Sequence, residues 1–380
     1  MIVLLLISAC SSKNSYHGNA KSPLNVDIPI NKELFFVEKQ TTVVSDDIFA
    51  LTLSQQDKIL KSVKQKKEQG FKSHKALEAV ISEKLSNFTY YGETYNAEKT
   101  MRLNSGNCMS LAILTTAYAK ILGLDFSYRE VNTIPVFEKK NNLVLSSSHV
   151  QTIIYDPDFV EKSNELYFQK PGVAIDYFPN KNNRIGKAFD ESTFTSMYYR
   201  NLAADALVDN DLPKAFFYAE KAYKNNTRNI EAINLLAVIH RRAGDDKSAE
   251  EIYKAGLTIE QSSIALISNY IMLLRKQNRH EEVTIYQKKL DSLDDPNPYN
   301  WLEQAYIAEQ NQNKSKAIRY YKKALENAPY LNEAYIGLYH IFRERGHTLE
   351  AKNMLKKALE WTYEIDERKQ YKQKLYSLVQ

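Results

Sequence analysis

The sequence predicts an α+β domain followed by an all-α solenoid of helical repeats. Three observations lead there: a polar, glycine-containing turn that opens an apolar helical stretch at Cys108, short strand-like runs after that stretch, and small residues that recur every 34 residues beyond about position 192. A chain of 380 residues has room for two or three domains, each with its own core. The apolar fraction of 43% and the charged fraction of 26% are typical of a globular protein.

Charge and composition exclude several classes of function. The net charge is +5, but acidic and basic residues are interspersed and form no basic stripe, so nucleic acid is not an expected partner. The chain contains no glycine-rich phosphate loop. Its histidines do not stand at metal-ligand spacing from a second Cys or His, so we expect neither a cofactor nor a metal.

The N-terminus carries a targeting pattern. An apolar run closes on Ile-Ser-Ala-Cys, which resembles the bacterial lipoprotein box, and the resemblance implies cleavage before Cys10 and lipidation of its sulfur. Residues 1–10 would be the signal and residues 11–49 a flexible tether from a membrane anchor. Ser11 replaces the aspartate that often retains such proteins at the inner membrane, so we expect the periplasmic face of the outer membrane. The alternative is an ordinary cysteine in a buried or frayed terminus.

The next segment, residues 50–192, reads as the α+β domain. Ser54 and Asp57 form a possible capping box for one helix, a second follows Ser73, and Gly123 ends the helix that begins at Cys108. Strand-like runs then follow at 126–131, 143–145, 149–155 and 173–178.

Cys108 is the leading candidate for a nucleophile. At a helix N-terminus, unpaired N–H groups and the helix dipole favour thiolate over thiol. If Cys10 is lipidated, Cys108 is the only other cysteine and has no disulfide partner. A buried structural cysteine is the alternative interpretation.

A cysteine nucleophile requires a base and a group that orients the base. His149, at a strand edge, is the candidate base, and Asp176, at the end of an apolar strand, is the candidate orienting acid. The backbone N–H of Cys108 would bind the oxyanion, helped by Asn104 or Asn107.

These residues resemble the transglutaminase-like superfamily, whose papain-related fold carries a Cys-His-Asp triad. The resemblance covers roughly residues 50–190 and implies acyl transfer through a thioester, to water or to an amine. An extra turn at 156–159 departs from the family, and no Trp follows the histidine, so either Asp176 or Asp156 could orient His149; we favour Asp176. The residues that carry the resemblance are Gly106-Asn107-Cys108, Ala112, Tyr118-Ala119, Leu122-Gly123-Leu124, His149 and Asp176.

The second half of the chain repeats. Small residues in three columns, each with a 34-residue step, are what antiparallel helices need where their backbones come close, and this period is the tetratricopeptide signature. The clearest unit is 299–329. We expect five repeats over 193–366, a capping helix over 367–380, and a groove that binds a protein or peptide, either through arginines or as a plain solvated face. The columns are 215, 249, 283, 317, 351; 222, 256, 290, 324, 358; and 203, 237, 271, 305, 339; the arginines are Arg241, Arg242, Arg275, Arg319 and Arg343.

Two functions follow from these patterns. The first is a cell-envelope, cysteine-dependent acyl-transfer enzyme, transglutaminase-like or a peptidase or amidase, whose repeats recruit a protein or peptide substrate. The alternative is a non-catalytic adaptor lipoprotein whose transglutaminase-like domain is structural.

Overall fold

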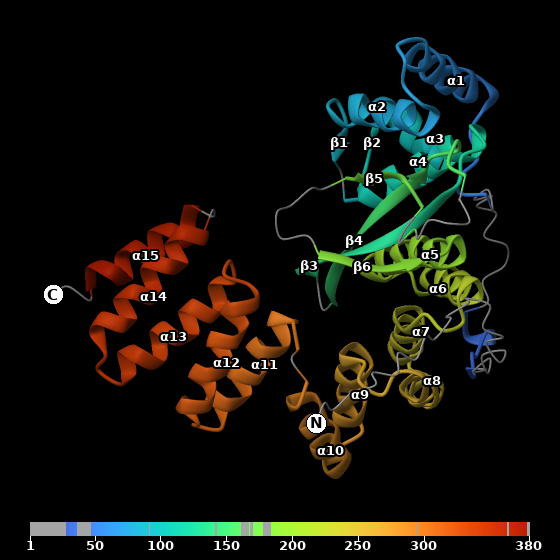
Figure 1. Cartoon of the computed structure of the whole chain (residues 1–380). Coiled ribbons are helices and arrows are strands. Elements are labelled where there is room, and N and C mark those ends of the chain that lie inside the picture. The colour runs from blue at the N-terminus through green and yellow to red at the C-terminus, as the bar shows by residue number, and fades with distance from the viewer. Residues whose placement is uncertain are drawn as a thin grey trace, which may run out of the picture.

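The structure is a computed structural model and is mostly helical (Figure 1). Its described residues form fifteen α-helices, one 3₁₀ turn and six strands. Cys10 and most of the expected tether lie outside these residues. The described residues are 28–35, 47–90, 92–140, 143–160, 167, 170–177, 184–293, 295–362 and 365–377.

Two helices open the α+β part. Thr52 is the N-cap of helix α1. Its side chain accepts a hydrogen bond from the Gln55 N–H, and the Gln55 side chain accepts one from the Thr52 N–H, so the two residues form a full capping box. The box therefore lies two residues before the expected one at Ser54, because Thr52 and Gln55 supply both reciprocal bonds. Helix α1 spans Leu53–Glu68, and helix α2 spans Ser73–Leu85.

A four-stranded antiparallel sheet follows, in the order β5-β4-β3-β6. Strands β3 and β4 are longer than expected because the ladder continues through the polar run Ser146–Ser148, where the apolar signal in the sequence stops. The strands are β3 Phe126–Lys140, β4 Leu143–Tyr155, β5 Gly172–Asp176 and β6 Arg184–Phe189, and a separate parallel pair is β1 Thr89–Tyr90 and β2 Ser105–Gly106.

Helices α3 (Ala97–Leu103) and α4 (Cys108–Ile121) complete this part. The sequence expectation did not include α3, which Asn96 caps through its side chain. Helix α4 is buried along almost its whole length and ends at Ile121. Gly123, the residue after the C-cap Leu122, adopts a positive φ of 63° as expected of a glycine that closes a helix.

The sheet and the first repeat helix share one core. The Tyr128 ring of β3 stacks on Phe194 of α5 with centroids 4.0 Å apart, and its hydroxyl bonds to Thr116 of α4 at 2.9 Å. A single buried cluster runs from Ile28 to Leu290, across the expected domain boundary at residue 192. Helix α5 therefore belongs to both parts.

Beyond the sheet the helices come in five antiparallel pairs with a 34-residue step (Figure 1). The small-residue columns are buried as the period predicts, except at the half-buried Val283: Ala203, Ala237 and Ala305, for example, are fully buried. The helices are α5 Glu191–Val208, α6 Leu212–Asn225, α7 Ile230–Arg242, α8 Asp246–Ile259, α9 Ile264–Lys276, α10 His280–Asp291, α11 Pro298–Gln310, α12 Lys314–Asn327, α13 Asn332–Glu344, α14 Thr348–Trp361 and the final α15 Ile365–Ser377.

The solenoid core is interrupted between its third and fourth pairs. The first cluster ends at Leu290, and a second begins at Trp301 and continues into a third around α14 and α15. Polar contacts join α9 to α11 across this junction: Asn300 Nδ2 donates to Ser268 Oγ at 3.2 Å, and Arg275 pairs with Glu303 at 3.0 Å. Figure 1 shows α11–α15 extending away from α9 and α10.

Candidate functional site

Cys108 is the first residue of α4, where the sequence placed it. Asn107 is the N-cap, and its Oδ1 accepts the Ser110 N–H at 3.0 Å. Gly106 has a φ of 143°, and a Cβ there would lie 2.6 Å from the Ser110 Cβ. The turn before Cys108 therefore requires glycine.

The environment of the thiol differs from the expectation. Burial raises the pKa of Cys108, and although the backbone N–H groups of Met109 and Cys108 act to lower it, burial outweighs them, with the negative charge of Asp176 raising it further. The helix N-terminus acts as expected, but desolvation of the charged form is larger. In this structure the protonated thiol is favoured.

Asp176 lies in the same neighbourhood as the thiol. It ends β5 opposite Gln151 of β4, whose Nε2 donates to Asp176 Oδ2 at 2.8 Å. Burial, with the charges of Cys108 and Asp176, raises the pKa of Tyr90, and the Tyr90 hydroxyl donates to the Tyr177 carbonyl at 2.9 Å. The thiol, the carboxylate and the phenol therefore lie within electrostatic range of one another near the N-terminus of α4.

His149 belongs to β4, where its backbone pairs with Val131 of β3. The His149 side chain lies outside the described residues, so its role as a base stays a prediction.

Asp156, the alternative orienting acid, has other partners. Its Oδ2 accepts from Lys72 Nζ at 2.9 Å, and its Oδ1 lies 3.5 Å from Nδ1 of the buried His74 on α2. The hydrogen bond from Lys72 is the main reason that the pKa of Asp156 lies below its usual value. This carboxylate holds α2 against the end of β4.

The two asparagines proposed as oxyanion donors are also engaged. Asn104 Nδ2 donates to the Asn87 carbonyl at 2.8 Å. Asn107 Nδ2 donates to Thr94 Oγ1 at 2.7 Å and to the Gly92 carbonyl at 3.3 Å. The N–H groups of Cys108 and Met109 are the donors that act on the sulfur.

Among the described residues, one polar side-chain contact joins the repeats to this site. Asn201 of α5 donates to Thr94 Oγ1 at 3.4 Å, the same oxygen that accepts from the Asn107 side chain. Further along, Asn269 Nδ2 of α9 donates to Asn234 Oδ1 of α7 at 3.1 Å. Half-buried carboxamides therefore stand on the first helices of successive pairs. Sequence reasoning missed them because their separations, 234−201 = 33 and 269−234 = 35 residues, do not follow the 34-residue columns.

Several arginines expected in the groove are used inside the solenoid. Arg242 donates to the Leu207 carbonyl at 3.2 Å, and Arg343 donates to the Tyr339 hydroxyl at 3.2 Å. Arg275 pairs with Glu303, as described above, and Arg319 lies 5.4 Å from the Tyr320 ring centroid. These contacts favour structural roles for the four side chains.

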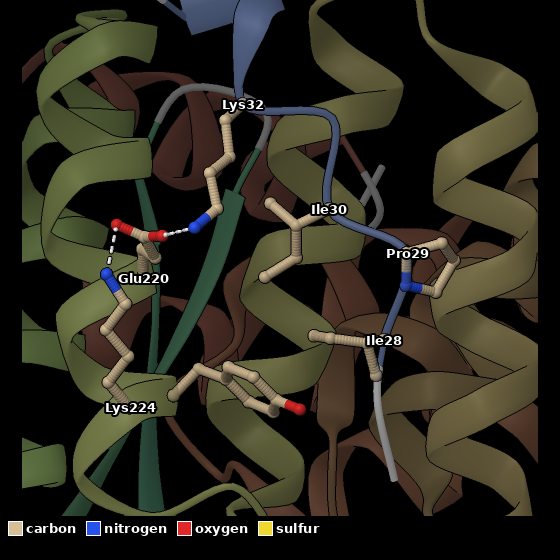
Figure 2. A pocket seen from close by; sticks show the side chains of 7 residues that line it. Ile28, Pro29, Ile30, Lys32, Glu220 and Lys224 are labelled. Carbon is tan, nitrogen blue, oxygen red and sulfur yellow. Dashed lines mark ion pairs between the residues drawn. The ribbon is translucent and has the colours of Figure 1, made fainter.

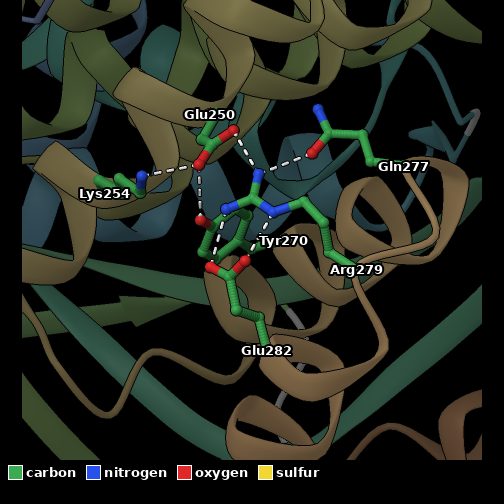
Figure 3. A network of polar contacts seen from close by, with 6 residues as sticks. All are labelled: Glu250, Lys254, Tyr270, Gln277, Arg279 and Glu282. Carbon is green, nitrogen blue, oxygen red and sulfur yellow. Dashed lines mark hydrogen bonds and ion pairs between the residues drawn. The ribbon is translucent and has the colours of Figure 1, made fainter.

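A charged network braces the third pair (Figure 3). Arg279 takes the N-cap position of α10 and binds Glu282 and, at 2.7 Å, Glu250 of α8. Glu250 also accepts from Lys254 and from the Tyr270 hydroxyl. The hydrogen bond from Arg279 is the main cause that lowers the pKa of Glu250 to about 2.

Within the residues that the structure describes, no cluster of three or more His, Cys, Asp or Glu side chains could hold a metal ion. In the same residues, no helix combines the length and apolarity that crossing a membrane requires.

Comparisons with known proteins identify one repeat. The family model of the tetratricopeptide repeat matches residues 299–330, which confirms that part of the sequence prediction. No curated protein matches the chain. The transglutaminase-like and lipoprotein resemblances stay predictions.

Solved structures similar to the chain share low identity with it. A Pseudomonas aeruginosa pilF structure is 16% identical, covers 49% of this chain and 90% of its own, and has a TM-score of 0.38. A MamA structure is 18% identical, with 42% and 94% covered and a TM-score of 0.33. Yeast Tom70 is 16% identical, with 48% and 40% covered and a TM-score of 0.41.

Proposed function

We propose that the chain is a protein-binding adaptor whose helical repeats capture an extended segment of a partner protein. The observation that carries this proposal is the run of five helix pairs, with carboxamide side chains on the first helices of successive pairs at Asn201, Asn234 and Asn269. Stacked repeats present a long continuous surface. A carboxamide both donates and accepts hydrogen bonds, so it suits the backbone of an extended peptide.

The shared core supports a scaffold role for the α+β part. Because Phe194 of α5 is fully buried against Tyr128 of the sheet, this part fixes the first repeat rigidly. Residues 50–192 would then brace the solenoid that follows, with α15 (Ile365–Ser377) as its closing helix in place of the expected 367–380.

A selected ligand tests the adaptor proposal. A displayed library of random peptides is panned on the full chain, and the tightest peptide is mapped by hydrogen exchange. We expect slower amide exchange in α7 and α9, where Asn234 and Asn269 lie. Protection confined to α1–α4, or no peptide above background, would count against the proposal.

A second candidate function is cysteine-dependent acyl transfer, with Cys108 as nucleophile, His149 as base and Asp176 as the orienting acid. The observation that favours it is the thiol at the start of α4, with the N–H groups of Cys108 and Met109 at the sulfur and Asp176 in electrostatic range. The imidazole would take the thiol proton, and the sulfur would attack an acyl carbon. The leaving group would then depart with that proton, and water or an amine would release the acyl group from the thioester.

The five helix pairs and the tetratricopeptide match at residues 299–330 make the adaptor the better-supported function. A protonated thiol is a poor nucleophile unless a base accepts its proton. Alkylation by iodoacetamide near pH 7 separates the two cases. If the triad operates, His149→Ala slows alkylation of Cys108 at least tenfold; equal rates in the two proteins would contradict it.

We further propose export and anchoring through Cys10, at the periplasmic face of the outer membrane. The support is the Ile-Ser-Ala-Cys sequence itself. Labelling with an alkyne fatty acid in a bacterial host should mark the wild-type chain and leave Cys10→Ser unmarked. Equal labelling of both would contradict the anchor.

A further inference from the structure

A short segment near the N-terminus lies across the repeats. Residues 28–35 fall within the stretch that the sequence assigns to a flexible tether, yet the structure packs them against α6 and α7 (Figure 2). Ile28 is 4% exposed and Phe35 is 8% exposed. The segment therefore behaves as a bound peptide.

Phe35 is the apolar anchor of this segment. Its ring stacks on Phe216 of α6 with centroids 4.2 Å apart and an angle of 9° between the planes. The His240 ring of α7 meets it edge-on at 5.1 Å. Since Phe216 and His240 also contact each other at 5.7 Å, they form an aromatic seat.

Two hydrogen bonds fix Asn31. Its backbone N–H donates to His240 Nε2 at 3.2 Å, and its Nδ2 donates to Asp245 Oδ2 at 3.0 Å. His240 Nδ1 lies 2.8 Å from the Leu236 carbonyl, which places the ring proton on Nδ1 and leaves the Nε2 lone pair for Asn31. The imidazole thus accepts a hydrogen bond from the backbone of the segment, and Asp245 accepts one from its amide side chain.

Lys32 supplies the charged contact. Its Nζ lies 2.7 Å from Glu220 Oε1, and Lys224 binds the other oxygen of Glu220 at 3.0 Å (Figure 2). Burial acts to raise the pKa of Glu220, but the hydrogen bonds from Lys32 and Lys224 hold it below its usual value. The carboxylate is therefore charged and ready for a cation.

We propose that this surface of α6, α7 and α8 is a peptide-binding site for a segment with an amide side chain, then a lysine, then an aromatic residue three positions later, which a 3₁₀ turn at Glu33–Phe35 brings onto the surface. In this chain Asn31, Lys32 and Phe35 of residues 28–35 occupy it. The site is distinct from the carboxamides of α7 and α9 and does not depend on the adaptor proposal.

The site persists without its occupant. Helices α6 and α7 bury other residues against each other and the rest of the solenoid, among them Ala219, Ala222, Ile233 and Leu236, all fully buried. Removing the segment exposes the aromatic seat but leaves this core intact. A peptide added from outside must compete with a segment of the same chain, which has a high effective concentration.

Peptide binding to the full chain tests the site. The probe is a fluorescent octapeptide with the sequence of residues 28–35, and the open variant carries Asn31→Ala, Lys32→Ala and Phe35→Ala. We expect the open variant to bind the probe at least tenfold more tightly than wild type, because its own segment no longer competes. Adding Phe216→Ala to the open variant should weaken binding at least tenfold.

Leu34→Ala is the matched control, since Leu34 lies in the same segment but is 45% exposed. It should bind the probe as weakly as wild type does. Equal affinity of wild type and the open variant, or no binding by a folded open variant, overturns the proposal. Should the open variant fail to fold, hydrogen exchange on the wild-type chain decides: excess unlabelled peptide should speed exchange at residues 28–35, and unchanged exchange overturns the proposal.

Discussion

The shared core predicts how a single truncation spreads through the molecule. Phe194→Ala removes a fully buried ring that stacks on Tyr128 at 4.0 Å and faces Phe49 at 6.3 Å. Phe→Ala in a core costs about 3–5 kcal/mol. The lost aromatic pair is part of that figure, at about 0.5–1.5 kcal/mol. We therefore expect Phe194→Ala to lower the free energy of unfolding by about 4 kcal/mol for the unit that shares this core, from Ile28 to Leu290.

That unit ends at Leu290, where the first buried cluster stops. The junction beyond it is polar, and the Arg275–Glu303 pair has side chains 33% and 53% exposed. Exposed ion pairs contribute about 0–1 kcal/mol. The α11–α15 block should therefore keep its own stability when the first unit is weakened.

Hydrogen exchange in low denaturant measures both units at once. Phe194→Ala should lower protection from α1 to α10 and leave α11–α15 nearly unchanged. The matched variant is Leu355→Ala in α14, fully buried in the last cluster, which should do the reverse at a cost of about 2–5 kcal/mol. If either variant lowered protection equally in α1–α10 and in α11–α15, the claim that the two blocks have separate cores would be refuted.

Three further predictions concern single sites. Gly106→Ala should destabilise the α+β part by about 3 kcal/mol or more, measured by urea denaturation, because its Cβ would meet the Ser110 Cβ at 2.6 Å and its φ of 143° disfavours any side chain. Since the folded pKa of Glu250 is about 2 against 4.5 for the free side chain, its stabilising effect is complete above about pH 4.5 and lost as the pH falls toward 2; thermal melts should show a smaller acid loss in Arg279→Ala. Burial lowers the pKa of His240 below 6.5, so the unfolded chain binds that proton first and stability should fall as the pH drops below about 6.5; melting at pH 7.5 and 5.5 should show a smaller difference in His240→Gln.

Periodicity made the solenoid predictable. The columns that contain Ala215, Ala249 and Ala317 have one structural cause, close approach of helix backbones, and it repeats every 34 residues. The Cys108 helix was also predictable, since its polar turn, apolar run and closing Gly123 are all local signals.

Features that depend on distant contacts could not be predicted. Phe35 binds Phe216, far along the chain, and nothing near either residue marks the contact. The pKa of Cys108 was misjudged because the sequence shows the helix N-terminus but not the burial that outweighs it. Helix α3 is only seven residues long, too short for an apolar period to mark it in the sequence.

The most direct test of the adaptor function compares affinities for one peptide selected on the full chain. Asn234→Ala combined with Asn269→Ala should weaken binding at least tenfold, since it removes the bonded carboxamide pair of α7 and α9. Cys108→Ser should leave the Kd within about twofold, and so should Asn225→Ala, an exposed asparagine on α6. A tenfold loss in Cys108→Ser, with the double variant unaffected, would contradict the adaptor and move recognition to the thiol site.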